Sequence, residues 1–370
     1  MNILIVGDAS NFHVTLAEEF RALGHSVTIM SEGCRWMDTA RDIDITRRPG
    51  LAGALRYGAR LLSLLPKMRG WDVVYIFSLN FLDLRPEKLL AVFRYLRRHN
   101  RHVVYSMLNT DYYYVKACLD CETYRYSDFR IGSAPSPYAT LLPAKEHEWT
   151  TDAMRRLAEG VAEGIDMLIA CLWEYHEAYR KVIPDKLRYG GIPIKTSGID
   201  RHIIEEEPAK VRFFLGYHRD RMALKGTDRI LEALKNVVAR HPDKAEMELV
   251  SNVPYREYIE RLNSSHVMLD QLYSYTPATN ALLGMARGMV AVSGAEPEYY
   301  DFIGEQENRP IINISPLDGG DIEQKLEWIV ANKSRFPELS RRSVEFVAKH
   351  NDSRVVAQRH LKYLSEIVKP

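Results

Sequence analysis

The sequence contains little cysteine, almost no net charge and no long apolar run. Its four cysteines, Cys34, Cys118, Cys121 and Cys171, are too few for a disulfide framework in a chain of 370 residues and fit a reducing compartment. A net charge of +1 argues against nucleic-acid binding by bulk electrostatics. No stretch approaches the roughly 18 apolar residues of a membrane span. Asp8 interrupts the apolar start, which is typical of a first strand rather than a signal peptide. We therefore expect a cytoplasmic protein.

Cys118 and Cys121 form a C-x-x-C motif. A zinc site would need two further ligands, and the sequence has no second pair at a suitable spacing. A thioredoxin-like site would need the motif at a strand-to-helix junction that opens a βαβ unit. We interpret both residues as incidental thiols, with a metal or redox role as the alternative.

Strand and helix patterns alternate along most of the chain, which predicts a parallel α/β architecture. Residues 188–210, rich in glycine, proline and charge, interrupt this alternation and indicate a linker. A chain of this length also favours two domains. We expect Rossmann-like, doubly wound domains at 1–195 and 196–345, with ligands in an interdomain cleft at the carboxyl ends of the strands.

Residues 270–294, DQLYSYTPATNALLGMARGMVAVSG, predict a helix that leads into a buried strand. Thr276 is a candidate N-cap, and Pro277 suits the first helical turn. Gly288 is expected to end the helix, and MVAVSG forms the strand. The first amides of such a helix are unpaired and lie at its positive end, so they favour a phosphate group.

Six short segments occur in the order of the motifs of one known enzyme family. VRFFLGYHRDRMALKGTDRILEAL is similar to the start of that family's second domain, where a strand ends in glycine, a basic loop follows and Lys-Gly begins a helix. ERLNSSHVMLDQL, LLGMARGMVAVSG and GAEPEYYDFI resemble three later segments of the same domain. NFHVTLAEEFRALGHSVTIM resembles the opening helix and second strand of the first domain. NDSRVVAQRHLKYL resembles the last helix, here within 346–370, which crosses back to the first domain. Together they resemble the retaining GT-B glycosyltransferases, family 4 in particular.

The chain departs from this family at positions that matter for chemistry. Relatives carry two glutamates eight residues apart that touch the donor's sugar and ribose, and these positions hold Tyr275 and Leu283. The arginine often found after the glycine of the second domain is replaced by Tyr217. A histidine common at the end of a first-domain strand is missing around 108–109. Neutral groups can take over hydrogen bonds from an acid, so these losses do not by themselves imply an inactive protein.

The expected donor site combines the basic loop with the helix start. The candidate catalytic residues are Lys225, Arg221 and Arg219, because fixed cations stabilise the charge that develops on a leaving nucleoside diphosphate. The candidate donor-binding residues are Gly216, Tyr217, Thr276, Thr279, Asn280 and Glu298. The alternatives are a solvated basic loop, a capped helix whose asparagine bonds locally, and a first-turn acid favoured by the helix dipole.

The expected acceptor site lies in the first domain, with Ser10, Asn11, His13, Asn109 and Asp111 as candidate residues. The segment 109–129 is rich in tyrosine, whose ring can stack on a sugar while its hydroxyl forms a hydrogen bond. A dimer surface and a place in the core are alternatives for these tyrosines, and a structural role is the alternative for His13.

Residues 45–71 contain six arginines and lysines and no acid. The leucines at 51, 55, 62 and 65 fall on one helical face beside Arg56, Arg60 and Lys67. This pattern, over 47–69, is typical of an amphipathic helix that lies on an anionic membrane surface. The alternative is an ordinary helix whose leucines face the core.

The resemblance implies a glycosyltransferase of the hexosyltransferase type. It would move a sugar from a nucleotide-sugar donor to a glycan or lipid-linked acceptor, in bacterial surface polysaccharide synthesis. It also implies retention of configuration and no metal or cofactor. A non-catalytic GT-B homologue that binds a sugar nucleotide or glycan is the alternative, and a GT-B epimerase is a second one, which would need carboxylates that are sparse here.

Overall fold

Parallel strands alternate with helices in both halves of the structure. The computed structural model describes residues 1–33 and 38–368, so Cys34 lies outside the described residues. The chain divides into two compact units. Unit 1 consists of Met1–Lys116, His147–Pro193 and Ser353–Pro370, and unit 2 of Ala117–Glu146 and Ile194–Asp352. Residues 117–146, which the sequence analysis assigned to the N-terminal domain, thus pack with the C-terminal half of the chain.

Unit 1 is built on a seven-stranded parallel sheet with the strand order β3-β2-β1-β4-β5-β8-β9. The strands are β1 (Asn2–Val6), β2 (Ser26–Ser31), β3 (Ile43–Asp44), β4 (Val73–Ile76), β5 (His102–Met107), β8 (Met167–Ala170) and β9 (Leu187–Tyr189). The helices are α1 (Phe12–Ala22), α2 (Gly50–Leu64), η1 (Leu65–Met68), α3 (Pro86–His99), α7 (Asp152–Gly164), α8 (Trp173–Tyr179), η2 (Pro184–Lys186) and α16 (Ser353–Ile367). Two more, α4 (Tyr112–Leu119) and α6 (Ala144–Thr150), carry the chain out of unit 1 and back.

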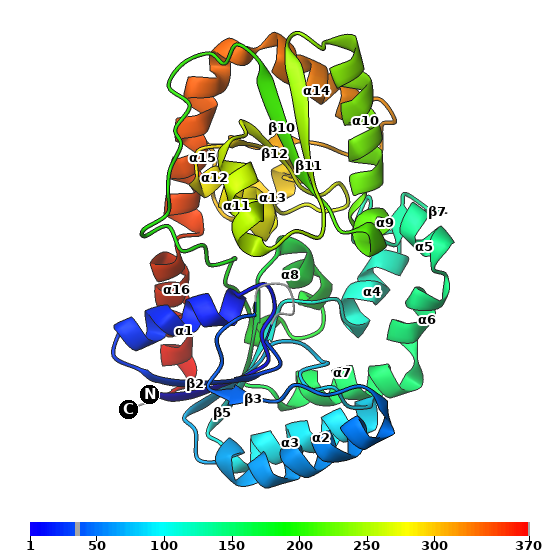
Figure 1. Cartoon of the computed structure of the whole chain (residues 1–370). Coiled ribbons are helices and arrows are strands. Elements are labelled where there is room, and N and C mark those ends of the chain that lie inside the picture. The colour runs from blue at the N-terminus through cyan, green and yellow to red at the C-terminus, as the bar shows by residue number, and fades with distance from the viewer. Residues whose placement is uncertain (34–37, 369–370) are drawn as a thin grey trace. The chain divides into compact units, whose positions relative to one another are not determined.

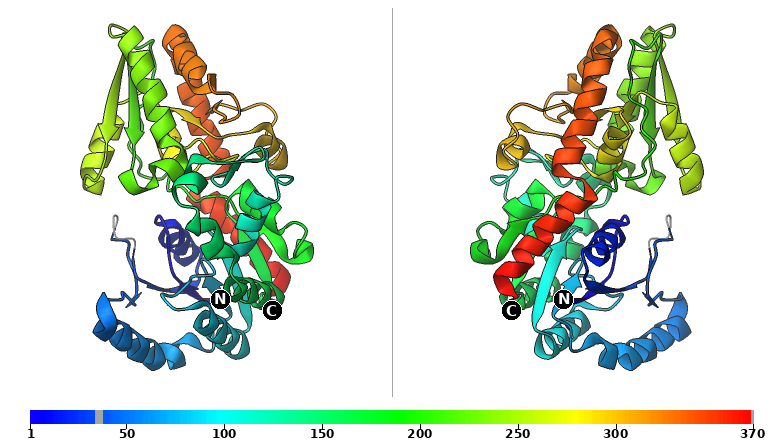
Figure 2. Two further views of the ribbon diagram at one scale, coloured as in Figure 1. Left: turned by 90° about the vertical axis from the view of Figure 1, so that its right-hand side faces the viewer. Right: turned by 90° about the vertical axis from the view of Figure 1, so that its left-hand side faces the viewer.

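The order of the strands reverses at β1, so right-handed crossovers place helices on both faces of this sheet. Helices α1 and α16 pack together on one face, and α3 packs with α7 on the other (Figures 1 and 2). The central strands are buried on both faces, which explains their continuous apolar sequences.

Unit 2 is built on a five-stranded parallel sheet with the order β11-β10-β12-β13-β14. Its strands are β10 (Val211–Gly216), β11 (Ala245–Val250), β12 (Val267–Leu269), β13 (Val290–Ser293) and β14 (Ile312–Asn313), with a separate hairpin of β6 (Arg130–Ile131) and β7 (Ala134–Pro135). Its helices are α5 (Pro137–Leu141), η3 (Arg219–Arg221), α9 (Met222–Lys225), α10 (Thr227–Arg240), α11 (Tyr255–Asn263), α12 (Thr279–Ala286), α13 (Pro297–Phe302), α14 (Asp321–Ala331), η4 (Lys333–Arg335) and α15 (Phe336–His350).

Two apolar clusters fill unit 2, one on each face of its sheet. The larger one joins inward residues of β10, β12 and β13 to α10, α14 and the start of α15. The smaller one includes Phe214, Tyr258, Met268 and Met289, from the opposite side of the strands and from α11. The parallel α/β alternation predicted from the sequence is thereby confirmed.

One predicted helix start is wrong. Helix α12 begins at Thr279 with Ala278 as its N-cap residue, and no side chain caps it. Thr276 and Pro277 belong instead to the irregular loop that follows β12. Proline suits a first helical turn but also an extended approach to one, so the sequence pattern placed the start two residues too early. The end was predicted correctly: Gly288 follows the helix with φ +99° and leads into β13.

Candidate functional site

The centre of the candidate site in unit 2 is the ion pair between Lys225 and Asp270. Lys225 ends α9, and its Nζ lies 3.3 Å from Asp270 Oδ1. Asp270 follows β12, its side chain is 1% exposed, and its Oδ2 accepts a bond of 3.4 Å from the amide of Ala281 in the first turn of α12. The loop cation and the helix start are therefore joined by one buried carboxylate. Sequence analysis missed Asp270, although its place directly after a buried strand is the usual place for a site residue.

Two glycines are required for this geometry. A Cβ on Gly216, at the end of β10, would lie 2.6 Å from the ring of Tyr258. Gly226, next to Lys225, has φ +69°, and a Cβ there would lie 2.7 Å from Cβ of Leu272. The amide of Leu272 in turn donates to the carbonyl of Lys225 at 2.8 Å. Both positions lack space for a Cβ atom, and Gly226 also has a φ that other residues rarely adopt, so both favour glycine.

The remaining cations of the loop are open to solvent. Arg219 and Arg221 lie in η3 with exposed side chains, and Tyr217 packs partly against the larger apolar cluster. Thr279 and Asn280 are half-buried at the first two positions of α12, whereas Thr276 is buried in the preceding loop. The amides at this helix start and the ammonium of Lys225 are suited to an anionic ligand.

Tyr275, which stands where relatives have the first of two glutamates, is buried within unit 2. Its ring stacks on that of Tyr126, with centroids 4.8 Å apart and planes at 21°. Its hydroxyl oxygen accepts a 2.7 Å bond from the amide of Arg125. Leu283 lies one turn beyond Asn280 in α12 and is half-buried. Tyr275 is therefore engaged in packing, so its hydroxyl does not replace the missing carboxylate.

Glu298, the expected donor-binding acid, belongs to a small network around Arg125. Nη2 of Arg125 lies 2.8 Å from Glu298 Oε1 and 2.8 Å from Glu296 Oε2. Glu296 also accepts bonds from the hydroxyl of Tyr126 at 2.6 Å and from the side-chain amide Nδ2 of Asn313 at 3.0 Å. Burial would raise the pKa of Glu296, but these hydrogen bonds outweigh it and hold the pKa below its ordinary value. The candidate residues chosen from the sequence do not include Glu296, Arg125 or Asn313, and Arg125 lies 171 positions from Glu296 in the chain.

The candidate acceptor residues of unit 1 differ in accessibility. His13 and Asp111 are fully buried, Asn11 and Asn109 are half-buried, and Ser10 is exposed. Asp111 accepts hydrogen bonds from two tyrosine hydroxyls, Tyr105 at 2.9 Å and Tyr179 at 2.6 Å, and from the amide of Tyr114 at 3.0 Å. Burial raises the pKa of Asp111. Asp111 is therefore a buried structural residue that links these three tyrosines by hydrogen bonds.

His13 is the second residue of α1, and its side chain is buried among aromatic rings. It contacts Phe12 and Tyr75, and His360 of α16 stacks on Tyr75 at 6.1 Å. Burial lowers the pKa of both histidines to about 3. Asp8 accepts a 2.7 Å bond from the amide of His13, and burial raises its pKa. Both imidazoles are therefore neutral at ordinary pH, and they contribute to packing rather than carrying charge.

A cavity of about 510 Å³ opens in unit 1 at the carboxyl ends of β1, β2 and β4. Its lining includes Asp8, Glu32, Phe77, Asp83 and Trp149. Aromatic walls with a few carboxylates suit a ligand rich in hydroxyl groups. Glu32 and Phe77 directly follow strands β2 and β4, and this position could have identified them from the sequence.

The tyrosines of 109–129 are mostly packed. Tyr112, Tyr114, Tyr124 and Tyr126 are buried, and Tyr113 is half-buried. Cys118 Sγ lies 3.9 Å from Asp128 Oδ1, and Cys121 is exposed. Within residues 1–33 and 38–368, no cluster of three or more histidine, cysteine or acidic side chains is arranged to hold a metal ion.

Known structures share the Rossmann-like fold found in each of the two units. No family model matches the sequence, and no curated protein matches it. Sucrose-phosphate synthase from Thermosynechococcus elongatus is 12% identical, with 99% of each chain covered and a TM-score of 0.66. Anabaena HepE in complex with UDP-glucose is 11% identical, with 99% of this chain and 100% of that chain covered and a TM-score of 0.62. WaaG, a glycosyltransferase involved in lipopolysaccharide biosynthesis, is 12% identical over the whole of both chains, with a TM-score of 0.55. At this level of identity the likeness defines the fold: an α/β protein of two Rossmann-like units, the GT-B fold of these glycosyltransferases.

Proposed function

We propose that the protein is a glycosyltransferase that moves a sugar from a nucleotide-sugar donor to a glycan or lipid-linked acceptor. The observation that carries this proposal is the Lys225–Asp270–Ala281 arrangement, which holds a cation beside the open amides of a helix start. Such a site suits a diphosphate. Two of the similar structures contain UDP-glucose or UDP with glucose, which makes UDP-sugars the first donors to test.

In this proposal unit 2 binds the donor. Lys225, Arg219 and Arg221 stabilise the negative charge of the departing nucleoside diphosphate, and the amides of Thr279 and Asn280 bind its phosphates. Asn280 and Glu298 bond to hydroxyl groups of the donor, because Tyr275 and Leu283 cannot supply the missing carboxylates. Gly216 and Tyr217 line the nucleotide. The reaction retains configuration, and protein cations supply the positive charge that a metal ion would otherwise provide, so EDTA should leave transfer unchanged.

Unit 1 binds the acceptor in this proposal. The cavity at the ends of β1, β2 and β4 offers Trp149 and Phe77 for stacking and carboxylates for sugar hydroxyls. Ser10, Asn11 and Asn109 are the candidate residues whose side chains retain exposure. His13 and Asp111 then act by holding the loops in place, since both are buried.

We also propose that the acceptor is reached at an anionic membrane surface through α2. Leu51, Leu55 and Leu62 are 80%, 68% and 69% exposed, whereas Tyr57, Leu61 and Leu64 form the buried face. Of the four leucines on this face, Leu51, Leu55 and Leu62 thus do not face the core, and Leu65 is half-buried. Arg56, Arg60 and Lys67 are exposed on the same segment, so apolar and basic groups are presented to solvent together. None of the helices in the described part of the chain is long and apolar enough to cross a membrane. Residues 47–69 would therefore lie on the bilayer surface, at the site of polysaccharide assembly.

A panel of nucleotide sugars in a thermal-shift assay tests the proposed function. A ligand at one hundred times its dissociation constant stabilises a protein by about 2.7 kcal/mol, so the cognate donor should raise the melting temperature measurably. Donor hydrolysis or transfer is then measured with the stabilising compound. Binding without any turnover would favour the non-catalytic homologue, and the absence of binding across the panel would refute the transferase.

A further inference from the structure

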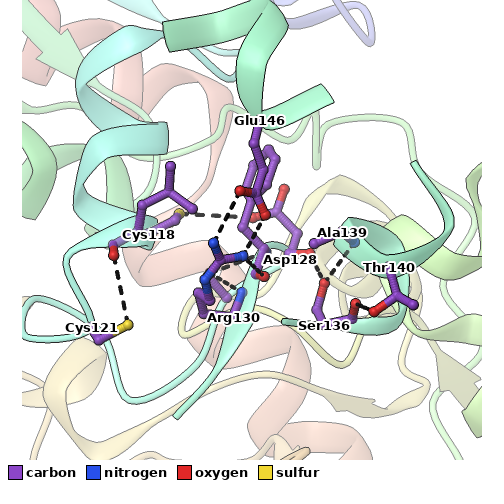
Figure 3. A network of polar contacts seen from close by, with 11 residues as sticks. Cys118, Cys121, Asp128, Arg130, Ser136, Ala139, Thr140 and Glu146 are labelled. Atoms are coloured by element: carbon purple, nitrogen blue, oxygen red, sulfur yellow. Dashed lines mark hydrogen bonds and ion pairs between the residues drawn. The ribbon is translucent and has the colours of Figure 1, made fainter. Parts of the chain in front are cut away.

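Residues 117–146, here called the 117–146 segment, are held together by hydrogen bonds between their own side chains and backbone (Figure 3). The guanidinium of Arg130 binds both carboxylate oxygens of Glu146, near the end of the segment. The hydroxyl of Ser136 donates to the carbonyl of Asp128 and accepts from the amide of Ala139 at 3.1 Å, which caps α5. The segment therefore has a defined shape rather than that of a loose loop.

The segment docks on three parts of unit 2 that belong to the proposed donor site. Helix α5 packs against α9, the helix that ends at Lys225. Tyr126 stacks on Tyr275 in the loop before α12. Arg125 binds Glu298 in α13, and its guanidinium also lies 5.5 Å from the ring centre of Tyr275. One upstream segment thus contacts the cation loop, the helix-start loop and the donor-side acid.

Arg125 is the residue that connects these contacts. Its Nη2 bridges Glu296 and Glu298 at 2.8 Å each, and its amide bonds to Tyr275. Glu296 is 5% exposed and held by further hydrogen bonds, so it anchors the guanidinium in one place. Oε1 of Glu298 lies on Arg125, and its other oxygen, Oε2, is buried and has no hydrogen-bond partner among the described residues. The arginine therefore fixes the direction of a carboxylate whose second oxygen is left to accept a hydrogen bond.

We propose that the 117–146 segment is part of the donor site and that Arg125 is a positioning residue that orients Glu298 toward the donor sugar. This inference rests on the proposed function. An acid at the start of a short helix would otherwise sample several rotamers, and fixing it in advance lowers the entropic cost of binding. Sugar recognition then depends on a residue 171 positions before Glu296 in the chain.

A double-mutant cycle on Arg125→Met and Glu298→Gln tests the inference by calorimetry. The probes are UDP-glucose, or the nucleotide sugar that stabilises the protein most in the panel, and the matching nucleoside diphosphate. Arg125→Met should weaken binding of the nucleotide sugar about tenfold, the size of coupling within one charged network. Binding of the diphosphate alone should change less than about twofold, because it has no sugar for Glu298 to contact. The double variant should bind no more weakly than Glu298→Gln, and Arg125→Lys should lie between Arg125→Met and wild type.

Arg309→Met is the matched control. Arg309 pairs with Asp301 of the same helix α13 at 2.6 Å and lies 5.1 Å from the ring centre of Tyr300, but it does not contact Glu298. Its removal should change the affinity for the nucleotide sugar less than about twofold. Unchanged binding by Arg125→Met, or an equal loss for sugar nucleotide and diphosphate, would overturn the positioning role while leaving the transferase in place. A wild type that binds none of the probes would refute the proposed function itself, and this inference with it.

Discussion

Nζ of Lys225 lies 3.3 Å from Oδ1 of Asp270, and the other oxygen of that carboxylate bonds to the amide of Ala281. A buried carboxylate without a partner would destabilise the fold, so Asp270 is expected to keep both of its partners in place. Lys225 is 32% exposed, so its ammonium can still reach a ligand. This pair defines the place where we expect the donor diphosphate.

Lys225→Ala should weaken binding of UDP about tenfold or more, because it removes a charge-assisted contact of roughly 1.5–3 kcal/mol. Isothermal titration calorimetry measures this loss. Lys235→Ala is the control, since Lys235 is an exposed lysine of the neighbouring helix α10. Equal affinity of Lys225→Ala and wild type would place the diphosphate elsewhere.

Asn280→Ala should slow transfer several-fold and leave the fold intact. A neutral hydrogen bond contributes about 0.5–1.5 kcal/mol, and Asn280 lies in the first turn of α12, where a short side chain can reach a ligand. Asn280→Leu should be slower still, because it adds an apolar group that accepts no hydrogen bond. Steady-state rates with the donor from the panel test this order, and a variant as fast as wild type would show that Asn280 has no part in transfer.

Arg56→Glu combined with Arg60→Glu should release the protein from vesicles containing anionic lipid. Each basic residue near such a surface contributes about 1 kcal/mol, and added salt should weaken binding in the same way. Leu51→Ser with Leu55→Ser should also reduce binding, although it leaves the charge unchanged. Co-sedimentation with anionic and neutral liposomes provides the measurement. The control is Arg155→Glu, on helix α7, and equal pelleting of all variants would leave α2 an ordinary solvated helix.

Acid should destabilise the protein through its buried histidines. The pKa of His13 and His360 is lowered from 6.5 to about 3 by burial, so the folded state keeps both neutral while the unfolded chain takes up protons below pH 6.5. Stability is thus highest above pH 6.5 and is lost as pH falls toward 3, by at most about 2.7 kcal/mol per pH unit for the pair.

Other groups near these histidines affect the same profile. Asp8 faces His13 at 3.9 Å and has a raised pKa, which opposes the loss at low pH, and the charge of Arg359 adds to the lowering at His360. The comparison is therefore made with a variant: His360→Gln should flatten the dependence of the urea midpoint on pH. His147→Gln, at an exposed position, should leave it unchanged. Parallel profiles for wild type and His360→Gln would refute the explanation.

Local sequence determined the strands, most of the helices and the two-unit α/β plan. A strand buried on both faces needs a continuous apolar run, and a helix on a sheet needs a period of 3.6, so Asn2–Val6 and Pro86–His99 are recognisable without any tertiary information. Gly216 and Lys225 could also be found locally, because a glycine at a strand end and a lysine in the following loop are close in the chain.

Tertiary structure alone decided which partners distant residues meet. Arg125 and Glu296 are 171 residues apart, and nothing in either local pattern shows that the 117–146 segment belongs to unit 2. His13 and Leu51 illustrate the same limit for burial: a histidine at a helix start and a leucine on an amphipathic helix can each face solvent or core. The neighbouring elements decide, since α16 packs on α1, where His13 is buried, whereas Leu51 stays exposed. Side-chain period defines the faces of a helix, and only long-range packing selects the one that is buried.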